Sequence, residues 1–327
     1  MKPVALNPLT AAIALLTCAC LPSIACAQAG YPVKPIRFIL GYAPGGSSDT
    51  VARVFGAKLH ESLGQPVVVD FRPGGNTVIA AEILTRAAPD GYTLLMVLNT
   101  HSINPLLMKL PYDPIKDFAP IASLGVSPYM LAVHPSLPVN NLKEFIAYAK
   151  ARAGVLNYSS SGAGGLGHLS GELFNQLTGV KTQHVPFKGG GPSVIALISG
   201  EVQMSFIIPI LVTGHIKAGK LKGMAVSGKQ RLPALPDTPT FAEAGLPSFE
   251  STNWFGALAP AATPNAIIGK LSREFNRIQL LNDVKDKLGA QGIDPLPGTP
   301  EQFASLIKSD TEKFAKVVRN ANIRLEQ

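Results

Sequence analysis

Two glycine-rich turns of similar design constrain the fold of this chain. The first is Tyr42-Ala-Pro-Gly-Gly-Ser-Ser-Asp49, and the second is Tyr158-Ser-Ser-Ser-Gly-Ala-Gly-Gly-Leu-Gly-His168. Each turn lies between a strand-like run and a run with helical periodicity. The N-terminus of a helix presents unpaired N–H groups and the positive end of its dipole, and glycines let a ligand approach them closely. One such turn often only connects a strand to a helix, but two in separate halves of the chain suggest a clamp for a carboxylate.

The N-terminus has the pattern of a secretory signal peptide. Lys2 precedes an apolar run from Leu9 to Leu21, and the small-residue site Ala25-Cys26-Ala27 follows. Cleavage after residue 27 would leave an exported chain of residues 28–327, located in the periplasm. No later stretch approaches the about 18 apolar residues that a transmembrane helix needs.

All three cysteines, Cys18, Cys20 and Cys26, lie in this predicted signal peptide. The mature chain is therefore expected to contain no disulfide, no cysteine metal ligand and no cysteine nucleophile. A lipoprotein anchored on Cys26 is the alternative, and it is disfavoured because Ser23 stands where a leucine is usual.

Length and charge limit the class of protein. A mature chain of this length normally forms two domains of about 150 residues. The net charge of +8 could suggest nucleic acid as a partner, but the basic residues are scattered and form no Lys/Arg block. We therefore expect no nucleic-acid binding, and the positive charge is better suited to attracting small anions.

Strand-like and helix-like segments alternate in the first part of the chain, which predicts βαβ units with a parallel sheet. The first helix is expected to begin with Ser48 or Asp49 as its N-cap and to end at Gly64. The predicted elements are strands Ile36–Leu40, Val67–Phe71 and Thr93–Leu98 and helices Asp49–Leu63 and Thr77–Ala87.

The same alternation restarts after a proline-rich passage, which predicts a second domain. One helix of this domain begins at Leu142, with Asn141 as N-cap and Glu144 three residues later. The other predicted elements are strands Tyr129–His134, Leu156–Ser159, Thr182–Val185, Val202–Ile208 and Lys222–Ser227 and helix Pro192–Ile198.

The final third of the chain is expected to be purely helical. Thr263-Pro264 and Thr299-Pro300 are predicted as N-cap and N1 pairs of two long helices, and Gly289 as the end of a helix between them. This tail is expected to pack onto the first domain.

Catalytic and cofactor motifs are incomplete. Gly162, Gly164 and Gly167 have the G-x-G-x-x-G spacing of a dinucleotide site, but no acidic residue stands about 20 residues further on. The G-x-S-x-G elbow of serine hydrolases is absent, and the six histidines show no metal-ligand spacing. We therefore expect no enzyme activity, no cofactor and no metal. For His168 two roles remain open: holding the loop by hydrogen bonds, or donating to the ligand.

These residues resemble the Bug receptors, the extracytoplasmic solute-binding subunits of tripartite tricarboxylate transporters. The resemblance covers the whole mature chain and rests on many ordered motifs. They are Pro44-Gly-Gly-Ser-Ser-Asp49, Gly64-Gln-Pro-Val-Val-Val69, Pro89-Asp-Gly-Tyr-Thr-Leu-Leu95, Asp117-Phe-Ala-Pro120, His168-Leu-Ser-Gly-Glu-Leu-Phe174, Val185-Pro-Phe-Lys-Gly189, Pro239-Thr-Phe-Ala-Glu-Ala-Gly245 and Trp254.

The resemblance implies an α/β, type II periplasmic binding protein fold: two lobes, two crossover segments and a ligand cleft between the lobes. After the signal peptide of residues 1–27, residues 28–126 and 256–327 would form lobe 1 and residues 127–255 lobe 2. The implied ligand is a small carboxylate or related metabolite, the implied partners are the transporter's membrane subunits, and the usual state is a monomer. Hinges are expected near Leu124–Tyr129 and Ser251–Phe255, where the domain pattern breaks.

Ligand contacts carried over from the family fall on both turns and on two further segments. In lobe 1 they are Tyr42, Gly45, Gly46, Ser47 and Asp49, with Thr100 and His101 from the segment Asn99–Ser102. In lobe 2 they are Ser159, Ser160, Ser161, Gly162, Gly164 and His168, with Pro186, Phe187 and Lys188 from the next turn.

Three of these positions, and one segment outside them, allow a second role or depart from the family. Asp49 could cap its helix or meet the ligand, and Lys188 could be a solvated lysine at the rim. Phe187 replaces a tyrosine that is common in the family and lacks its hydroxyl, and Asn76-Thr77 replaces glycines that are common after Pro73.

Two other functions fit the same fold or compartment. A periplasmic sensor module would share the fold and differ only in its partner. An exported hydrolase would need turnover that depends on Ser160 or Ser161.

Overall fold

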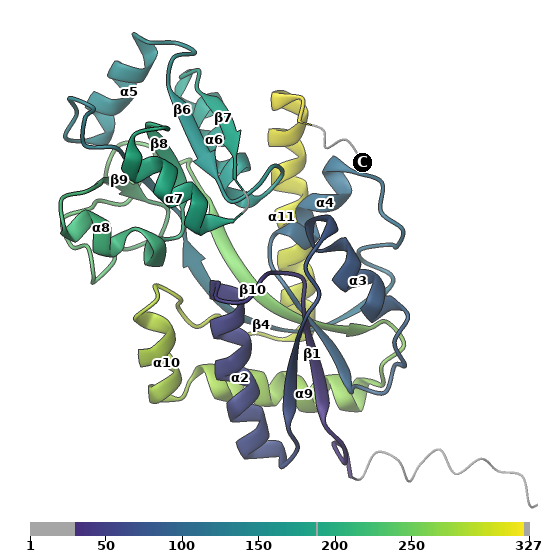
Figure 1. The fold of residues 1–327 in the computed structure, drawn as a ribbon. Helices are drawn as coiled ribbons and strands as arrows, with labels where there is room; N and C mark the ends of the chain where they lie inside the picture. The colour runs from purple at the N-terminus through teal and green to yellow at the C-terminus, as the bar shows by residue number, and fades with distance from the viewer. Residues whose placement is uncertain (1–29, 188, 324–327) are drawn as a thin grey trace, which may run out of the picture.

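Two five-stranded sheets organise the chain in the computed structural model, which describes residues 30–187 and 189–323 (Figure 1). The strand order is β2-β1-β3-β10-β4 in the first sheet and β7-β6-β8-β5-β9 in the second. Helices cover both sheets, so the predicted α/β fold with two lobes is confirmed. The predicted signal peptide lies outside the described residues.

The first sheet is mixed and not purely parallel as predicted. Strands β1 (Ile36–Leu40), β2 (Val67–Phe71) and β3 (Thr93–Val97) are parallel. Strand β10 (Thr252–Pro260) lies between β3 and β4 (Phe118–Pro128) and is antiparallel to both. The prediction that the final third is purely helical is therefore wrong, because β10 completes this sheet.

Helices cover both faces of the first sheet because successive residues of each strand point to opposite faces. Phe38 and Met96 pack with α2 (Ser47–Leu63), α9 (Asn265–Gln279) and α10 (Asn282–Gly289). Ile39 and Leu95 pack with α3 (Val78–Thr85) and with the first half of α11 (Pro300–Ala321). The short 3-10 turn η1 (Gly75–Thr77) precedes α3, and α4 (Thr100–Leu107) follows β3.

The second sheet is also mixed. Strands β6 (Asn157–Ser160), β7 (Gln183–Pro186) and β8 (Met204–Ile207) are parallel. Strand β5 (Met130–Val133) is antiparallel to β8 and to the edge strand β9 (Lys222–Val226). One face packs on α5 (Leu142–Lys150) and α6 (Leu166–Thr178), and the other on α7 (Gly190–Ser199) and η2 (Pro209–Leu211), which α8 (Thr213–Lys217) follows.

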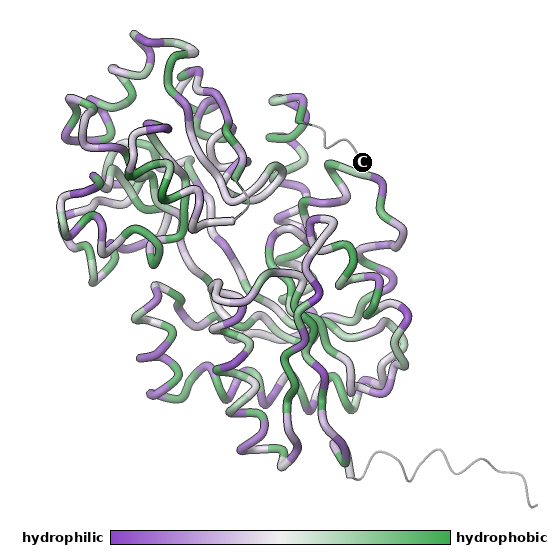
Figure 2. Tube along the Cα trace, viewed as in Figure 1, coloured by the Kyte–Doolittle hydropathy of each residue, from purple (hydrophilic) through white to green (hydrophobic). Residues whose placement is uncertain are grey.

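The hydropathy of the trace follows this layering (Figure 2). The strands of the first sheet are largely hydrophobic where helices cover them, whereas α10 on the outside is mainly hydrophilic. Within residues 30–187 and 189–323, no helix combines the length and apolar character needed to cross a membrane.

Helix ends agree with the sequence at some positions and differ at others. Asn141 caps α5, Thr299 forms a capping box with Gln302, and Gly64 ends α2 with φ 72°. The N-cap of α2 is Gly46, not Ser48 or Asp49, because Asp49 uses its carboxylate inside the preceding turn. Thr263 does not cap α9; its hydroxyl donates to the carbonyl of Pro260, and Pro264 is the N-cap.

The two segments that connect the lobes lie side by side. β4 leads into β5 through Tyr129, and the return to β10 passes Ser251. The Tyr129 N–H donates to the Ser251 carbonyl at 3.2 Å and to Ser227 Oγ at 2.8 Å. These segments coincide with the expected hinges, and hinge motion stays a prediction.

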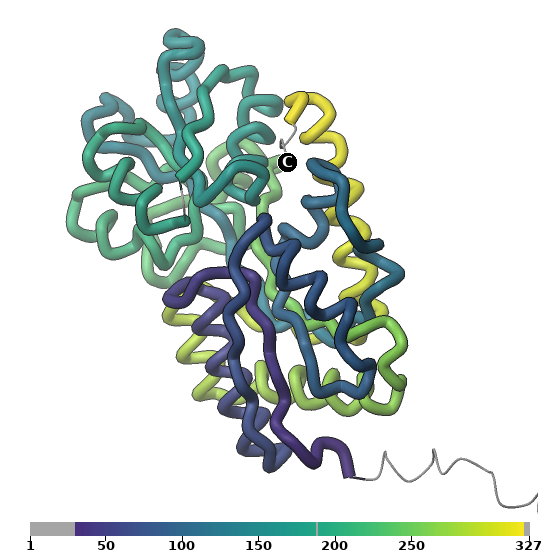
Figure 3. Tube along the Cα trace, turned by 45° about the vertical axis from the view of Figure 1, so that its right-hand side comes forward, coloured from purple at the N-terminus to yellow at the C-terminus, as the bar shows by residue number. Residues whose placement is uncertain are grey.

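Helix α11 contacts both lobes, as Figures 1 and 3 show for the last helix of the chain. Phe303 and Ile307 pack into the first-lobe core, whereas Phe314 and Val317 belong to the cluster that contains Phe174 of α6. The domain boundaries stay a prediction, and the tail packs on lobe 2 as well as on lobe 1.

Candidate functional site

The predicted ligand turns lie where parallel strands end. The turn after β1 and the turns after β6 and β7 lie on the sides of the two lobes that face each other (Figures 1 and 3). Ligands of open α/β sheets bind at the carboxyl ends of strands. The fold therefore brings the two glycine-rich turns to one region, although they are more than 100 residues apart.

The turn before α2 is held by Asp49. Its carboxylate accepts hydrogen bonds from the Gly45 N–H at 2.9 Å and from Arg53 Nε at 2.5 Å. Gly45 has φ 86°, a conformation that favours glycine. Asp49 thus stabilises the turn. No described residue accepts from the N–H groups of Ser47, Ser48 and Asp49, which form the first turn of α2.

Tyr42 and Thr100 meet across the ends of β1 and β3. The Tyr42 hydroxyl lies 2.5 Å from Thr100 Oγ1, and the tyrosine is half-buried. Burial raises the pKa of Tyr42, partly offset by the Thr100 hydrogen bond. The phenol is therefore neutral at pH 7 and adds a hydroxyl to the first-lobe wall.

The turn before α6 uses two of its expected donors internally. The Gly164 N–H donates to His168 Nδ1 at 3.0 Å, and the Gly162 N–H donates to Ser160 Oγ at 3.3 Å. His168 therefore holds the loop by accepting at Nδ1, which places the ring proton on Nε2. The N–H groups of the first turn of α6, in Leu166, Gly167 and His168, have no acceptor among the described residues.

A stacked histidine pair lies under this turn. The rings of His168 and His184 are 3.8 Å apart with an interplanar angle of 7°. Burial lowers the pKa of His168 to about 4, and burial together with the charge of His168 lowers that of His184 to about 3. Both rings are therefore neutral at pH 7. The hydroxyl of Tyr158 donates to Glu172 at 2.7 Å and to the His168 carbonyl at 3.2 Å, which ties β6 to α6.

Ser160 and His184 form a serine–histidine contact that the hydrolase alternative would need. Ser160 Oγ lies 2.7 Å from His184 Nε2 and 2.9 Å from the Gly162 carbonyl oxygen. Ser160 is only 1% exposed, so the hydroxyl is enclosed by its own loop and is not presented to a substrate. The contact therefore stabilises the turn.

Several expected ligand residues have other partners. Ser159 is buried and bonded to Ser193, and Phe187 packs on the second-lobe core. His101 Nε2 bonds to the Pro114 carbonyl at 2.8 Å and its ring packs edge-on to Phe118, so it anchors a loop inside lobe 1. These contacts do not support a ligand role for Ser159 or His101.

The turn after β7 was expected to supply the ligand contacts Pro186, Phe187 and Lys188, and only some of these residues are available for that role. Pro186 and Ser161 are exposed, and the Ser161 carbonyl accepts from the Gly189 N–H at 3.1 Å. The predicted role of Lys188 falls on a residue outside the described ranges.

Two buried polar groups lie near this region: Ser102, at the end of the predicted segment Asn99–Ser102, and Asn253, which the sequence did not single out. Among the described side chains, Ser102 Oγ and Asn253 Nδ2 are buried without a hydrogen-bond partner. Ser102 lies in the first turn of α4, which follows β3, and Asn253 lies near the start of β10, the strand beside β3. Asn253 could have been found from the sequence, because it is a polar residue inside an apolar strand.

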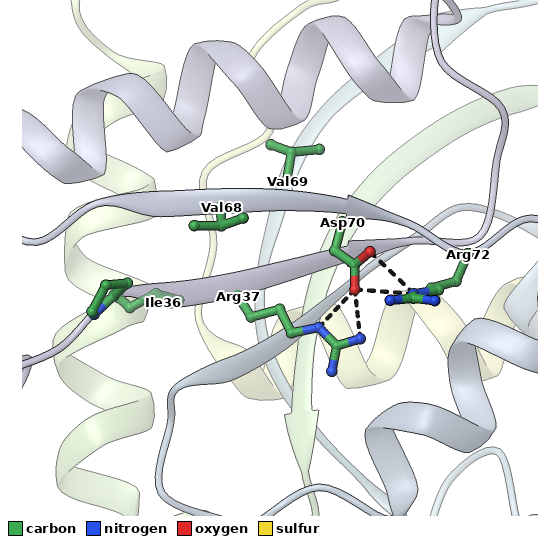
Figure 4. A pocket seen from close by; sticks show the side chains of 7 residues that line it. Ile36, Arg37, Val68, Val69, Asp70 and Arg72 are labelled. Carbon is green, nitrogen blue, oxygen red and sulfur yellow. Dashed lines mark hydrogen bonds and ion pairs between the residues drawn. The ribbon is translucent and has the colours of Figure 1, made fainter.

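A groove of about 370 Å³ lies elsewhere, at the β1–β2 edge of the first sheet (Figure 4). Its charged residues satisfy one another: Asp70 accepts from Arg37 Nε at 2.7 Å and from Arg72 Nε at 3.1 Å. Burial opposes ionisation of Asp70, but these hydrogen bonds hold its pKa below the usual value. Both arginines of the groove are thus bonded to the same carboxylate, that of Asp70. In the described part of the chain, no group of three His, Cys, Asp or Glu side chains is placed to hold a metal.

Comparison with known proteins gives a consistent assignment. Residues 51–323 match the model of the tripartite tricarboxylate transporter family receptor. Protein BugT of Bordetella pertussis is 36% identical over 299 residues, which cover 90% of this chain and 92% of BugT. The alignment with BugT thus extends over nearly the whole length of both proteins.

Two solved structures share the fold and have named ligands. The structure of R. palustris Rpa4515 with adipate has a TM-score of 0.83 and 32% identity, covering 90% of this chain and 99% of that one. MatC from Rhodopseudomonas palustris with bound malate has a TM-score of 0.78 and 34% identity, covering 88% and 100%. With two lobes, two opposed glycine-rich helix starts and these matches, the chain belongs to the tripartite tricarboxylate transporter receptor family, whose members include the Bug solute-binding proteins.

Proposed function

We propose that this receptor binds a small carboxylate between its lobes in the periplasm and delivers it to the membrane subunits of a tripartite tricarboxylate transporter. One observation carries the proposal: α2 and α6 begin on facing sides of the two lobes, each with unpaired N–H groups in its first turn. Helix N-termini favour negative charge. Adipate and malate in the related structures support a carboxylate.

The proposed contacts combine main-chain donors with a few hydroxyl groups. Gly46, Ser47 and the rest of the first turn of α2 would hold one side of the anion, and the first turn of α6 the other. Tyr42, Thr100 and Ser161 would add hydroxyl groups, and Gly45, Gly162 and Gly164 would shape the turns.

The affinity expected from such a site is moderate. A hydrogen bond to a charged group contributes about 1.5 to 3 kcal/mol. Four or five of them could leave about 8 kcal/mol after the costs of ordering and lobe closure, which corresponds to roughly micromolar affinity. No arginine is needed for binding of this strength.

Ligand binding is expected to close the lobes about the paired segments at Tyr129 and Ser251. Small-angle scattering with and without ligand measures this change. Identical curves in both states would contradict closure.

The first test is a thermal-shift screen of residues 28–327 against adipate, malate, other small carboxylates, amides, sugars and phosphates, with calorimetry on each hit. A ligand at ten times Kd stabilises the folded state by about 1.4 kcal/mol. A selective carboxylate supports the proposal, whereas selective binding of a sugar or phosphate, or no carboxylate binding at all, would overturn it.

Delivery to a transporter needs its own experiment. The ligand-loaded receptor should drive uptake of the labelled carboxylate into cells that carry the matching membrane subunits. Capture of a signalling protein in place of these subunits, with no uptake, would instead indicate a sensor module.

A further inference from the structure

We propose that Asp310 of α11 is a positioning residue for the ligand site: through Asn99 it fixes the turn that presents Thr100 and Tyr42. This inference rests on the proposed function, because it concerns the wall of that site. Among the described residues, the polar partners of Asp310 are Asn99, Trp254 and Lys313, none of which is a proposed ligand residue.

The Asp310 carboxylate is the centre of a buried hydrogen-bond network. It is 5% exposed, and its Oδ2 accepts from Asn99 Nδ2 at 2.8 Å and from Trp254 Nε1 at 3.1 Å. Lys313 Nζ lies 3.6 Å from the other oxygen, Oδ1. A buried carboxylate is costly unless it is paired and bonded, so these contacts fix its position.

Asn99 passes this constraint to the site. Its Oδ1 accepts from the Trp254 N–H at 3.1 Å, and its Nδ2 also donates to the Thr252 carbonyl at 3.2 Å. Its own carbonyl accepts from the N–H of Ile103 at 2.9 Å, which starts α4. Every polar group of this side chain is therefore used, and the residue that follows it is Thr100.

Thr100 completes the path to the glycine-rich turn. Its Oγ1 lies 2.5 Å from the Tyr42 hydroxyl, and Tyr42 begins the turn that leads to the N-terminus of α2. Asp310 is thus hydrogen-bonded to Asn99, Asn99 is covalently joined to Thr100, and Thr100 is hydrogen-bonded to Tyr42. This path connects α11 with the first-lobe wall.

Asp310 lies on α11 between residues that pack in the first lobe and residues that pack in the second. Ile307, one turn earlier, packs in the first-lobe core, and Phe314, one turn later, packs in the second-lobe cluster. Gln176 Nε2 of α6 donates to the Val317 carbonyl at 3.1 Å. A displacement of α11 by the second lobe therefore reaches the first-lobe wall through Asp310.

The network contains its own spectroscopic reporter. Trp254 is the only tryptophan of the sequence, is 1% exposed and donates its indole N–H to Asp310. The emission of Trp254 is therefore sensitive to the surroundings of this hydrogen bond.

The test compares four variants of residues 28–327. Asp310→Ala removes the acceptor, and Asp310→Leu removes it while filling the volume, which keeps the test valid if the alanine variant fails to fold. Asp310→Asn keeps an oxygen that can accept from Asn99 and Trp254 and is the expected rescue. Ile307→Ala, on the same helix, is the control for a loss of packing alone.

Hydrogen exchange of segments 42–47 and 98–104 and Trp254 emission are measured without ligand. We expect Asp310→Ala and Asp310→Leu to raise exchange in both segments at least tenfold over Ile307→Ala and to shift the emission, with Asp310→Asn close to the unmodified protein. Equal exchange in the Asp310 and Ile307 variants would overturn the positioning role, whatever the ligand.

Calorimetry with adipate and malate then tests the link to binding. We expect at least fivefold weaker binding in Asp310→Ala and a change of less than twofold in Asp310→Asn. Unchanged affinity in Asp310→Ala would overturn the link. If the unmodified protein binds no carboxylate of the panel, the proposed function fails, whereas the exchange measurement still decides whether Asp310 positions the two segments.

Discussion

The imidazole rings of His168 and His184 lie nearly parallel, 3.8 Å apart, beneath the turn that begins α6. His168 accepts from the Gly164 N–H, and His184 contacts Ser160 Oγ, so the pair supports both ends of the turn. The two rings cannot both be protonated in this arrangement without strong repulsion, because two positive charges at this separation repel each other.

Acid is therefore expected to destabilise the protein. Burial lowers the pKa of His168 from 6.5 to about 4 and that of His184 to about 3. Below pH 6.5 the unfolded chain binds protons that the folded protein does not, so the free energy of unfolding falls as pH falls, by up to about 1.4 kcal/mol per pH unit for each histidine. The fall ends only when pH passes below the folded-state values.

Urea unfolding between pH 4.5 and 7.5 measures this dependence. His184→Gln removes one titrating ring and should reduce the slope of unfolding free energy against pH below pH 6.5. Buried His101, whose pKa burial lowers to about 4, should still contribute to this slope in the variant. Leu169→Ala, a cavity variant in α6, should lower stability equally at every pH. A slope that His184→Gln leaves unchanged would contradict the neutral pair.

A side chain at Gly46 should block binding while the fold persists. Gly46 has φ −88° and ψ 178°, which any residue adopts, and the atom nearest to an added Cβ is the Ala43 carbonyl oxygen at 4.0 Å. Gly46→Leu should lower stability by about 1 kcal/mol through the poorer N-cap. By covering the N–H groups of α2 it should weaken carboxylate binding about 10- to 100-fold.

Calorimetry and thermal unfolding check this expectation. Gly214→Leu on α8 is the matched control, because an added Cβ there has room as well, with no atom within 4 Å, and the residue is exposed. Equal affinity in Gly46→Leu and the unmodified protein would place the anion away from α2.

Two buried serines should respond to alanine with opposite signs. Ser102 Oγ has no partner among the described residues, so Ser102→Ala removes an unpaired polar group from α4 and should raise the unfolding free energy by about 1 kcal/mol. Ser170 Oγ bonds to the Leu166 carbonyl at 2.7 Å and to Ser251 Oγ at 2.5 Å, so Ser170→Ala should lower it by about 1 kcal/mol. Equal losses in both variants, in urea unfolding, would show that Ser102 Oγ is satisfied.

The Ser160–His184 contact should prove structural. Ser160→Ala removes bonds to His184 and to the Gly162 carbonyl and should cost about 1 to 2 kcal/mol of stability. The unmodified protein should show no turnover of p-nitrophenyl esters above the buffer rate. Turnover that is present in the unmodified protein and lost in Ser160→Ala would instead support a hydrolase.

The sequence predicted those features whose causes are local. The N-caps Asn141 and Thr299 and the terminal glycine Gly64 depend on residues within one helical turn, and they are confirmed. The two glycine-rich turns also follow from neighbouring residues. The role of Asp49 was not predicted: from the sequence it could cap its helix or meet the ligand, whereas its carboxylate accepts from the Gly45 N–H inside the turn.

Long-range contacts account for what the sequence did not predict. Eight of the nine residues of β10 are buried, so the strand shows no alternation of polar and apolar residues, and its partners β3 and β4 lie more than 100 residues earlier. The bond between Asn99 and Asp310 spans 211 residues. No local pattern marks Asp310 as different from the other acidic residues of α11.

The place of β10 between β3 and β4 also sets an order of folding. The second sheet uses one continuous stretch of chain, from β5 to β9, and can form as soon as that stretch is complete. The first sheet cannot close until residues 252–260 arrive from beyond the second lobe, and such distant pairing is slow. A chain that emerges N-terminus first would therefore complete its second sheet before its first, and its ability to hold a ligand would be the last property to appear.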